Sequence, residues 1–160
     1  EDPAAFGALL RGCAGQRDYR ARIMAGRAMA ALTPLFQIPP LIVDILSEIC
    51  SSKPSTPNLE HGRIMQVLAL MQVYARDNKD KLATPELIEK LRTAGPALLG
   101  GRCPETQRAY LEACALAEEG AAAAAAAASS QPPAPAPASG AGAADLLGAV
   151  LPAAAAALAG

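Results

Sequence analysis

The stretch that decides the fold is Asp18-Tyr-Arg-Ala-Arg-Ile-Met-Ala-Gly-Arg-Ala-Met29, near the start of the chain. An aspartate begins a helix when its carboxylate accepts hydrogen bonds from the first free amides, and Asp18 is placed to do so. Small residues then recur at steps of three and four, which puts Ala21, Ala25 and Ala28 on one narrow face. Because alanine projects little beyond the backbone, a second helix can approach that face closely. The stretch therefore predicts one helix of a tightly packed pair.

Helix signals fill the rest of the body, and strand signals are nearly absent. Caps, prolines and apolar spacing predict six helices. The expected helices begin at Pro3, run from Asp18 to about Leu32, begin at Pro39-Pro40, run from about Glu60 to Arg76, run from Thr84 to a stop at Gly95-Pro96, and begin near Pro104. Short helices joined by short turns favour an all-α array in which each helical pair buries its apolar face on the next.

The composition changes sharply after Gly120. Of 39 alanines, 21 lie in residues 121–160, where Asp145 is the single charged residue. We therefore predict a helical-repeat segment over residues 1–120 and a disordered, low-complexity Ala/Pro/Gly tail over residues 121–160. The sixth helix could extend into Ala121–Ala128, because alanine has the highest helix propensity.

Charge and residue usage exclude several classes of protein. Residues 1–120 carry 14 basic and 14 acidic side chains, so their net charge is zero. This argues against binding nucleic acid through a large basic surface, but not against a local basic stripe. His61 is the single histidine, and the four cysteines are irregularly spaced, so we expect no metal site. The cysteines fit small buried side chains in a reducing compartment.

Catalysis by this chain is not expected. The sequence has no glycine-rich phosphate loop followed by a helix and lysine, no nucleophile-elbow pattern, and no strand that could carry a cofactor-binding turn. We therefore predict a protein that is not an enzyme and binds no cofactor.

The longest apolar stretch, residues 146–160, contains Pro152 and is shorter than the about 20 residues that a membrane helix needs. We expect a cytoplasmic protein with no membrane partner. An alternative is a secreted protein with a lipid anchor, for which the stretch would be the hydrophobic end of the signal after Ser139-Gly140-Ala141.

Three arginines are candidates for RNA contact. Arg20 and Arg27 are seven residues apart and share a helix face, and Arg17 lies just before that helix. Arginines along one edge can neutralise phosphates, and each such contact adds to the salt dependence of binding. The alternative is a solvated helix face with ion pairs to acidic neighbours such as Asp18.

Three blocks of sequence carry a resemblance to a known family. They are Arg22-x-Met-Ala-x-Arg-Ala28, then Asn58 followed by His61-Gly62 and Gln66-Val67, and last Cys103-Pro-x-Thr106-x-x-x-Tyr110. In this order and spacing, residues 5–118 resemble the THADA family, named after thyroid adenoma-associated protein. The family contains regulatory subunits of tRNA ribose methyltransferases.

The sequence departs from that family at two points. Leu59 stands where the family usually has a second histidine, and the family's Arg-Arg-Ser-Ala-Gly-x-Pro motif is missing. The chain would then be a fragment of a longer parent protein, and whatever depends on the missing motif cannot be carried by it.

The resemblance implies a HEAT/ARM-like solenoid that acts as a non-catalytic scaffold subunit. Such a protein assists an FtsJ-type methyltransferase in 2′-O-ribose methylation of the first nucleotide of the tRNA anticodon loop. The partners would be that enzyme and tRNA, and the methyl donor would belong to the enzyme. The alternative is a general HEAT-repeat scaffold for protein interactions, without a role in RNA binding.

Five residues are expected to have structural roles. Asp18 and Arg22 resemble the Asp–Arg ladder that links adjacent HEAT repeats, and Asn58 belongs to the second block. For His61 we favour a hydrogen bond that ties the loop at residues 51–57 to the following helix, with donation to a phosphate as the alternative. Gly62 is expected to permit close backbone packing.

Overall fold

A computed structural model describes residues 3–51 and 55–130 of the chain. Within these ranges the chain is all-α, as predicted, and contains no strand. The helices are α1 (Pro3–Gly12), α2 (Tyr19–Leu32), α3 (Ile38–Cys50), α4 (Pro57–Leu82), α5 (Pro85–Gly100) and α6 (Pro104–Ser130), with 3-10 turns η1 (Cys13–Gly15) and η2 (Leu35–Gln37). Residues 131–160, most of the predicted disordered tail, lie outside the described residues.

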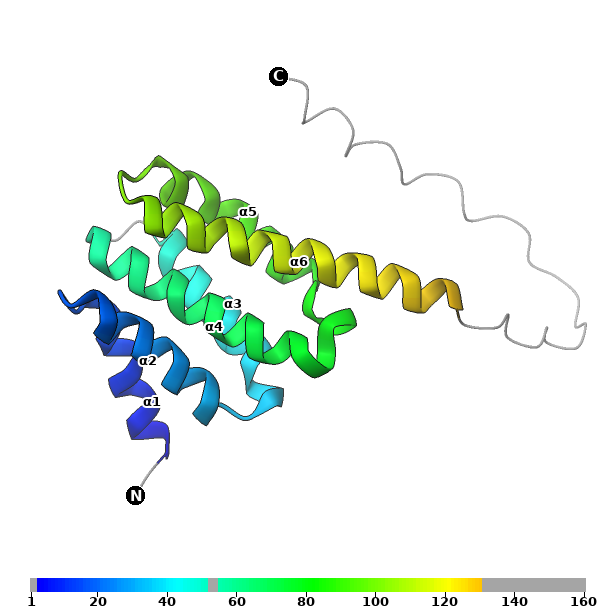
Figure 1. Ribbon diagram of the computed structural model, residues 1–160, viewed down its shortest axis with the longest axis horizontal. Coiled ribbons are helices and arrows are strands. Elements are labelled where there is room, and N and C mark those ends of the chain that lie inside the picture. The colour runs from blue at the N-terminus through cyan, green and yellow to red at the C-terminus, as the bar shows by residue number, and fades with distance from the viewer. Residues whose placement is uncertain (1–2, 52–54, 131–160) are drawn as a thin grey trace, which may run out of the picture.

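The helices form three consecutive pairs, α1 with α2, α3 with α4, and α5 with α6. Figure 1 shows α2, α4 and α6 side by side across the front, with α3 and α5 behind them. This two-layer stack of helical pairs is the predicted helical-repeat architecture, and its stability comes from contacts between neighbouring pairs.

Helix α4 is the centre of the fold. It packs against α2, α3 and α6 at once, so a wide arc of its surface is buried. Apolar residues that recur at helical spacing along α4, Ile64, Leu68 and Met71, are all buried. The isoleucine-rich face of α3 packs on the opposite side of the core. Its buried residues are Ile38, Ile42, Ile45, Leu46 and Ile49.

Two helices begin with the same device, a threonine cap followed by proline. The hydroxyl oxygen of Thr56 accepts a hydrogen bond from the Leu59 amide at 3.3 Å, and that of Thr84 accepts one from the Leu87 amide at 3.2 Å. Pro57 and Pro85 follow as the first helical residues, where a missing N–H costs no hydrogen bond.

The predicted stop at Gly95-Pro96 is wrong, because α5 continues through it to Gly100. The hydroxyl of Tyr110 donates a hydrogen bond to the Leu91 carbonyl at 3.0 Å, one turn before the proline. A side chain at Gly95 would collide with that hydroxyl, since an added Cβ would lie 2.8 Å from it. The glycine therefore makes room for α6 rather than ending α5.

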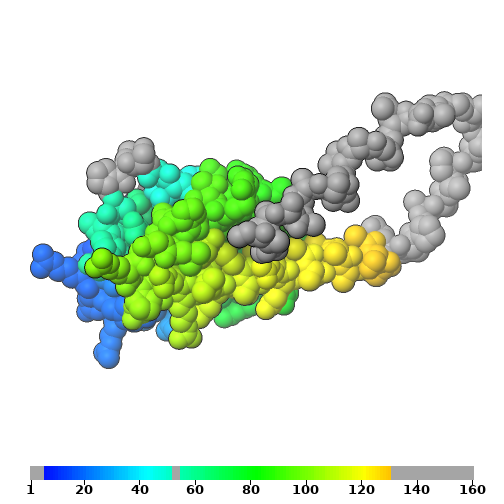
Figure 2. Space-filling view, turned by 90° about the horizontal axis from the view of Figure 1, so that it is seen from above, coloured from blue at the N-terminus to red at the C-terminus, as the bar shows by residue number. Residues whose placement is uncertain are grey.

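Helix α4 runs further than the sequence suggested, and α6 makes the extension into the alanine run that the sequence allowed. Helix α4 continues past Arg76 to Leu82, with a non-helical residue at Asn78 that kinks it. Helix α6 runs through the alanines to Ser130, ten residues beyond the predicted segment boundary at 120. Figure 2 shows this last part of α6 projecting from the body. It is held by helix propensity, because most of its residues are exposed.

Candidate functional site

The junction between the first and second helical pairs is built on the buried side chain of Arg22, which is 6% exposed. Its guanidinium donates to the carbonyls of Gln16 and Arg17 at 2.6 and 3.0 Å, and to Nδ1 of His61 at 3.0 Å. The chain between α1 and α2 is thereby fixed to α4. Asp18 instead caps α2 by accepting from the amides of Arg20 and Ala21, so the expected pairing of Asp18 with an arginine is replaced by an arginine–histidine pair.

His61 is 1% exposed and is held as an acceptor. Because Nδ1 accepts from Arg22, the neutral ring carries its proton on Nε2, which has no hydrogen-bond partner among the described residues. Burial and the Arg22 cation lower the pKa of His61, while Glu105 of α6 raises it by a smaller amount. His61 therefore binds α2, whereas the sequence suggested that it would tie the preceding loop to α4.

Two further residues of α4, Gly62 and Gln66, contact the backbone of the first pair. A Cβ added to Gly62 would lie 2.1 Å from the carbonyl oxygen of Ala14, so η1 lies directly against the helix. The buried amide of Gln66 donates to the Leu10 carbonyl of α1 at 2.9 Å. Because the Ala14 backbone lies so close, there is no space for a larger residue at Gly62.

An ion-pair cluster links α3 to the same junction. Glu48 accepts from Arg11 of α1 and from Arg63 of α4, the latter at 2.9 Å. One carboxylate thus links three helices. All three side chains are partly exposed, so each pair is screened by solvent and contributes modestly.

The candidate RNA-binding arginines lie outside this buried junction. Arg17, Arg20 and Arg27 are all exposed, and no ion pair within the described ranges holds any of them. Arg20 and Arg27 project from α2, while Arg17 is in the connection just before it. Asn58 is half-buried in the first turn of α4.

Charge is unevenly distributed along the stack. Residues 3–32 carry five arginines and one aspartate, a net charge of +4, whereas residues 85–130 carry four basic and six acidic residues, a net charge of −2. The neutral body is therefore a basic first pair and an acidic third pair. The first pair is the part suited to an anionic partner.

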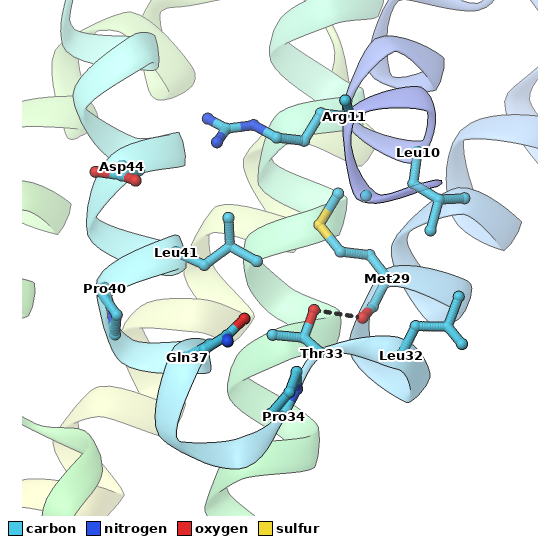
Figure 3. A pocket seen from close by; sticks show the side chains of 12 residues that line it. Leu10, Arg11, Met29, Leu32, Thr33, Pro34, Gln37, Pro40, Leu41 and Asp44 are labelled. Carbon is cyan, nitrogen blue, oxygen red and sulfur yellow. Dashed lines mark hydrogen bonds between the residues drawn. The ribbon is translucent and has the colours of Figure 1, made fainter. Parts of the chain in front are cut away.

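A groove of about 910 Å³ opens between α1 and α3, at the end of α2. Figure 3 shows Leu10, Met29 and Leu41 on its walls, with Arg11 and Asp44 at one end. Arg11 is engaged by Glu48. The groove is thus mainly an apolar surface.

Comparison with known proteins identifies the relatives of this chain. Residues 1–70 match the family of Trm732 C-terminal TPR repeats. The chain is also 32% identical over 83 residues to the tRNA (32-2′-O)-methyltransferase regulator THADA of Canis lupus familiaris. Over about half of its length, the chain is therefore similar to a protein of the THADA family. The match covers 51% of this chain but 4% of that relative, and no solved structure matches the chain.

Two of the three blocks that resemble the THADA family meet at the buried junction. Arg22 from the first block contacts His61 from the second, and Gly62 and Gln66 of the second lie against η1 and α1. These motif residues therefore join the first helical pair to the second, whereas Tyr110 of the third block makes its hydrogen bond within the third pair.

No three histidine, cysteine, aspartate or glutamate side chains come together as a possible metal site in the part of the chain that the structure describes. Its four cysteines are all free thiols. None of its single helices has the length and apolar character to cross a membrane, and one bent pair of segments, Tyr19–Leu32 with Leu35–Cys50, meets these criteria jointly.

Sequence reasoning missed Tyr19 and the role of Gln66. Tyr19 begins α2 and packs on His61, with ring centroids 5.2 Å apart. The signal available in the sequence was its place beside the Asp18 cap, one turn before Arg22. For Gln66, the signal was a glutamine within the apolar stripe of α4, where a buried amide needs a partner.

Proposed function

We propose that this segment belongs to a non-catalytic scaffold that assists an FtsJ-type methyltransferase in 2′-O-ribose methylation of the tRNA anticodon loop. Its partners are that enzyme and tRNA, and its location is the cytoplasm. The similarity to a methyltransferase regulator supports the role of the whole protein. The basic first pair supports a share of the tRNA contact for this segment.

The observation that carries the RNA contact is the exposure of Arg17, Arg20 and Arg27, without ion pairs in the described ranges. The buried Arg22 of the same region donates its hydrogen bonds to protein groups. Arg22 therefore has a structural role, whereas the three exposed arginines are free to bind a ligand. An exposed arginine that is not engaged by a carboxylate is available to a phosphate. A folded RNA is recognised mainly through its phosphates and shape.

The test measures binding of the full chain to total tRNA over a series of salt concentrations. Replacing Arg17, Arg20 and Arg27 together by glutamine is expected to weaken binding and to flatten the dependence of log affinity on log salt by about 0.7–0.9 per lost phosphate contact. The matched control is Arg92→Gln on α5, where the arginine is exposed but held by Glu89 at 2.7 Å. Equal affinity and slope for the triple variant and wild type would contradict the proposal.

The methyltransferase role is tested in the parent protein. We expect the triple variant, placed in the parent gene, to reduce 2′-O-methylation at the first nucleotide of the anticodon loop, while the Arg92→Gln gene preserves it. A general HEAT scaffold without an RNA role predicts that deletion of the whole gene leaves the methylation unchanged. Imaging of the tagged parent protein tests the cytoplasmic location.

A further inference from the structure

Tyr19 is an exposed aromatic residue that packs on two buried side chains, His61 and Arg22. It is the first residue of α2 and remains 45% exposed. Its ring centroid is 5.2 Å from that of His61, with the planes 30° apart, and 5.8 Å from Cζ of Arg22. Because Arg22 and His61 are buried and hydrogen-bonded to each other, they support the ring from the protein side. The ring is therefore held in place while much of it stays open to solvent.

Arginines outnumber the acidic groups near Tyr19, which are Asp18 at the cap of α2, Glu112 paired with Arg108, and Glu105 near His61. Arg17 and Arg20 are exposed on either side of it in the sequence. Arg108 of α6 lies close enough that Tyr19 adds to the rise in the pKa of Arg108, which Glu112 mainly causes. Aromatic rings also attract cationic ligands, but the arginines around this ring repel them. An anionic ligand with a flat, apolar part fits this combination better.

We propose that Tyr19 is a stacking platform for an unpaired base of an RNA strand, with Arg17 and Arg20 holding the flanking phosphates. This inference rests on the proposed function and adds the part of the RNA that is recognised. Proteins bind unpaired bases by stacking them on aromatic side chains, and a ring that is already immobilised loses little entropy on binding. A base inside a duplex is stacked on its neighbours and cannot reach such a platform.

The test compares two probes, a twelve-residue oligouridylate and an RNA duplex of the same length, bound to the full chain. The chain contains three tyrosines and no tryptophan, and Tyr74 and Tyr110 are partly or fully buried. We expect the oligouridylate to quench tyrosine fluorescence in wild type and not in Tyr19→Phe, which keeps the stacking surface and the affinity. Tyr19→Ala is expected to lose about 10-fold in affinity for the single strand and little for the duplex.

Two variants separate stacking from packing and charge. Tyr19→Leu keeps apolar contact with His61 but presents no flat surface, so we expect the affinity loss without a change in melting temperature. Phe36→Ala is the matched control, because Phe36 is 78% exposed beyond the other end of α2. The salt dependence should be unchanged by Tyr19→Leu and reduced by Arg20→Gln.

Each outcome decides between the two proposals. Single-strand affinity unchanged in Tyr19→Leu, with a loss in Arg20→Gln, overturns the platform and leaves the proposed function standing. Absence of binding by wild type to either probe and to tRNA overturns both. Preference for the duplex by wild type also overturns the platform, because stacking then plays no part in recognition.

Discussion

The two sides of α4 hold their neighbours in different ways. Toward the first pair, α4 uses polar and directional contacts, with His61 bound to Arg22 and Gln66 bound to the Leu10 carbonyl. Toward the third pair it meets α6, whose buried small residues include Ala113, Ala117 and Gly120. The ion pair on that side, Lys79 with Glu119 at 2.7 Å, lies at the exposed surface. We call these the polar junction and the small-residue junction.

The difference shows what each kind of junction provides. A buried guanidinium and imidazole are costly to desolvate, so the polar junction is stable only while Arg22 keeps its hydrogen bonds to the acceptors around it. Small residues allow close packing with little directional demand, and they tolerate small shifts. The polar junction therefore fixes one geometry beside the exposed arginines, whereas the small-residue junction mainly contributes buried area.

The largest expected effect comes from filling the space at Gly62. In Gly62→Ala the new Cβ would lie 2.1 Å from the Ala14 carbonyl oxygen, so the backbone of η1 must move. We expect a loss of about 3 kcal/mol in the free energy of unfolding, measured by urea denaturation followed by circular dichroism. Gly7→Ala in α1 is the control, because a Cβ there meets nothing within 4 Å. Unchanged stability for Gly62→Ala would mean that η1 does not pack on α4.

The second effect comes from removing the centre of the polar junction. Arg22→Met leaves the acceptors at Gln16, Arg17 and His61 without their donor, and we expect a loss of about 2–3 kcal/mol by the same measurement. Arg22→Lys should rescue little, since an ammonium cannot make the same directional contacts. Arg20→Met, on an exposed position of the same helix, should stay within about 0.5 kcal/mol of wild type. A stable Arg22→Met would show that the polar junction contributes no stability.

A third prediction uses pH to weaken one junction and spare the other. Burial and Arg22 lower the pKa of His61 in the folded chain below its value of about 6.5 in the unfolded chain. Stability contributed by neutral His61 is therefore complete above pH 6.5 and falls as the pH drops below it, with a slope no steeper than about 1.4 kcal/mol per pH unit. Urea denaturation between pH 5.5 and 7.5 measures the slope. His61→Gln should remove it, and an equal slope in that variant would assign the titration to other groups.

The smallest effect is expected within the third pair. Tyr110→Phe removes one hydrogen bond, from the tyrosine hydroxyl to the Leu91 carbonyl, and leaves the ring in place. We expect a loss of about 1 kcal/mol in the free energy of unfolding, with no dependence on pH below 8, because burial raises the pKa of this hydroxyl well above that range. Tyr74→Phe, at a half-buried position of α4, serves as the control. A loss as large as that of Arg22→Met would show that one hydrogen bond within the third pair contributes as much stability as the centre of the polar junction.

Local features of the sequence predicted the helices and their order. Asp18, Thr84-Pro85 and the spacing of apolar residues act within one or two turns, so their effect can be read along the chain. The pairing of Arg22 with His61 spans 39 residues and depends on how two pairs stack, which no local pattern encodes. The passage of α5 through Gly95-Pro96 was also missed, because the local signal of glycine followed by proline is typical of a helix end.

The exposed position of the candidate arginines followed from helix spacing alone. Their clustering on a basic first pair, opposed by an acidic third pair, is also a property of the sequence. The platform at Tyr19 required the structure, because its support comes from α4.

The open groove between α1 and α3 affects how loss of structure is detected. Dyes such as anilinonaphthalene sulfonate fluoresce on exposed apolar surface, and their binding is a usual sign of loosened packing. This groove offers apolar walls that include Leu10, Met29 and Leu41. The native chain is therefore expected to bind the dye. A dye signal alone would then report the intact fold, and loosening would appear as a change relative to that baseline.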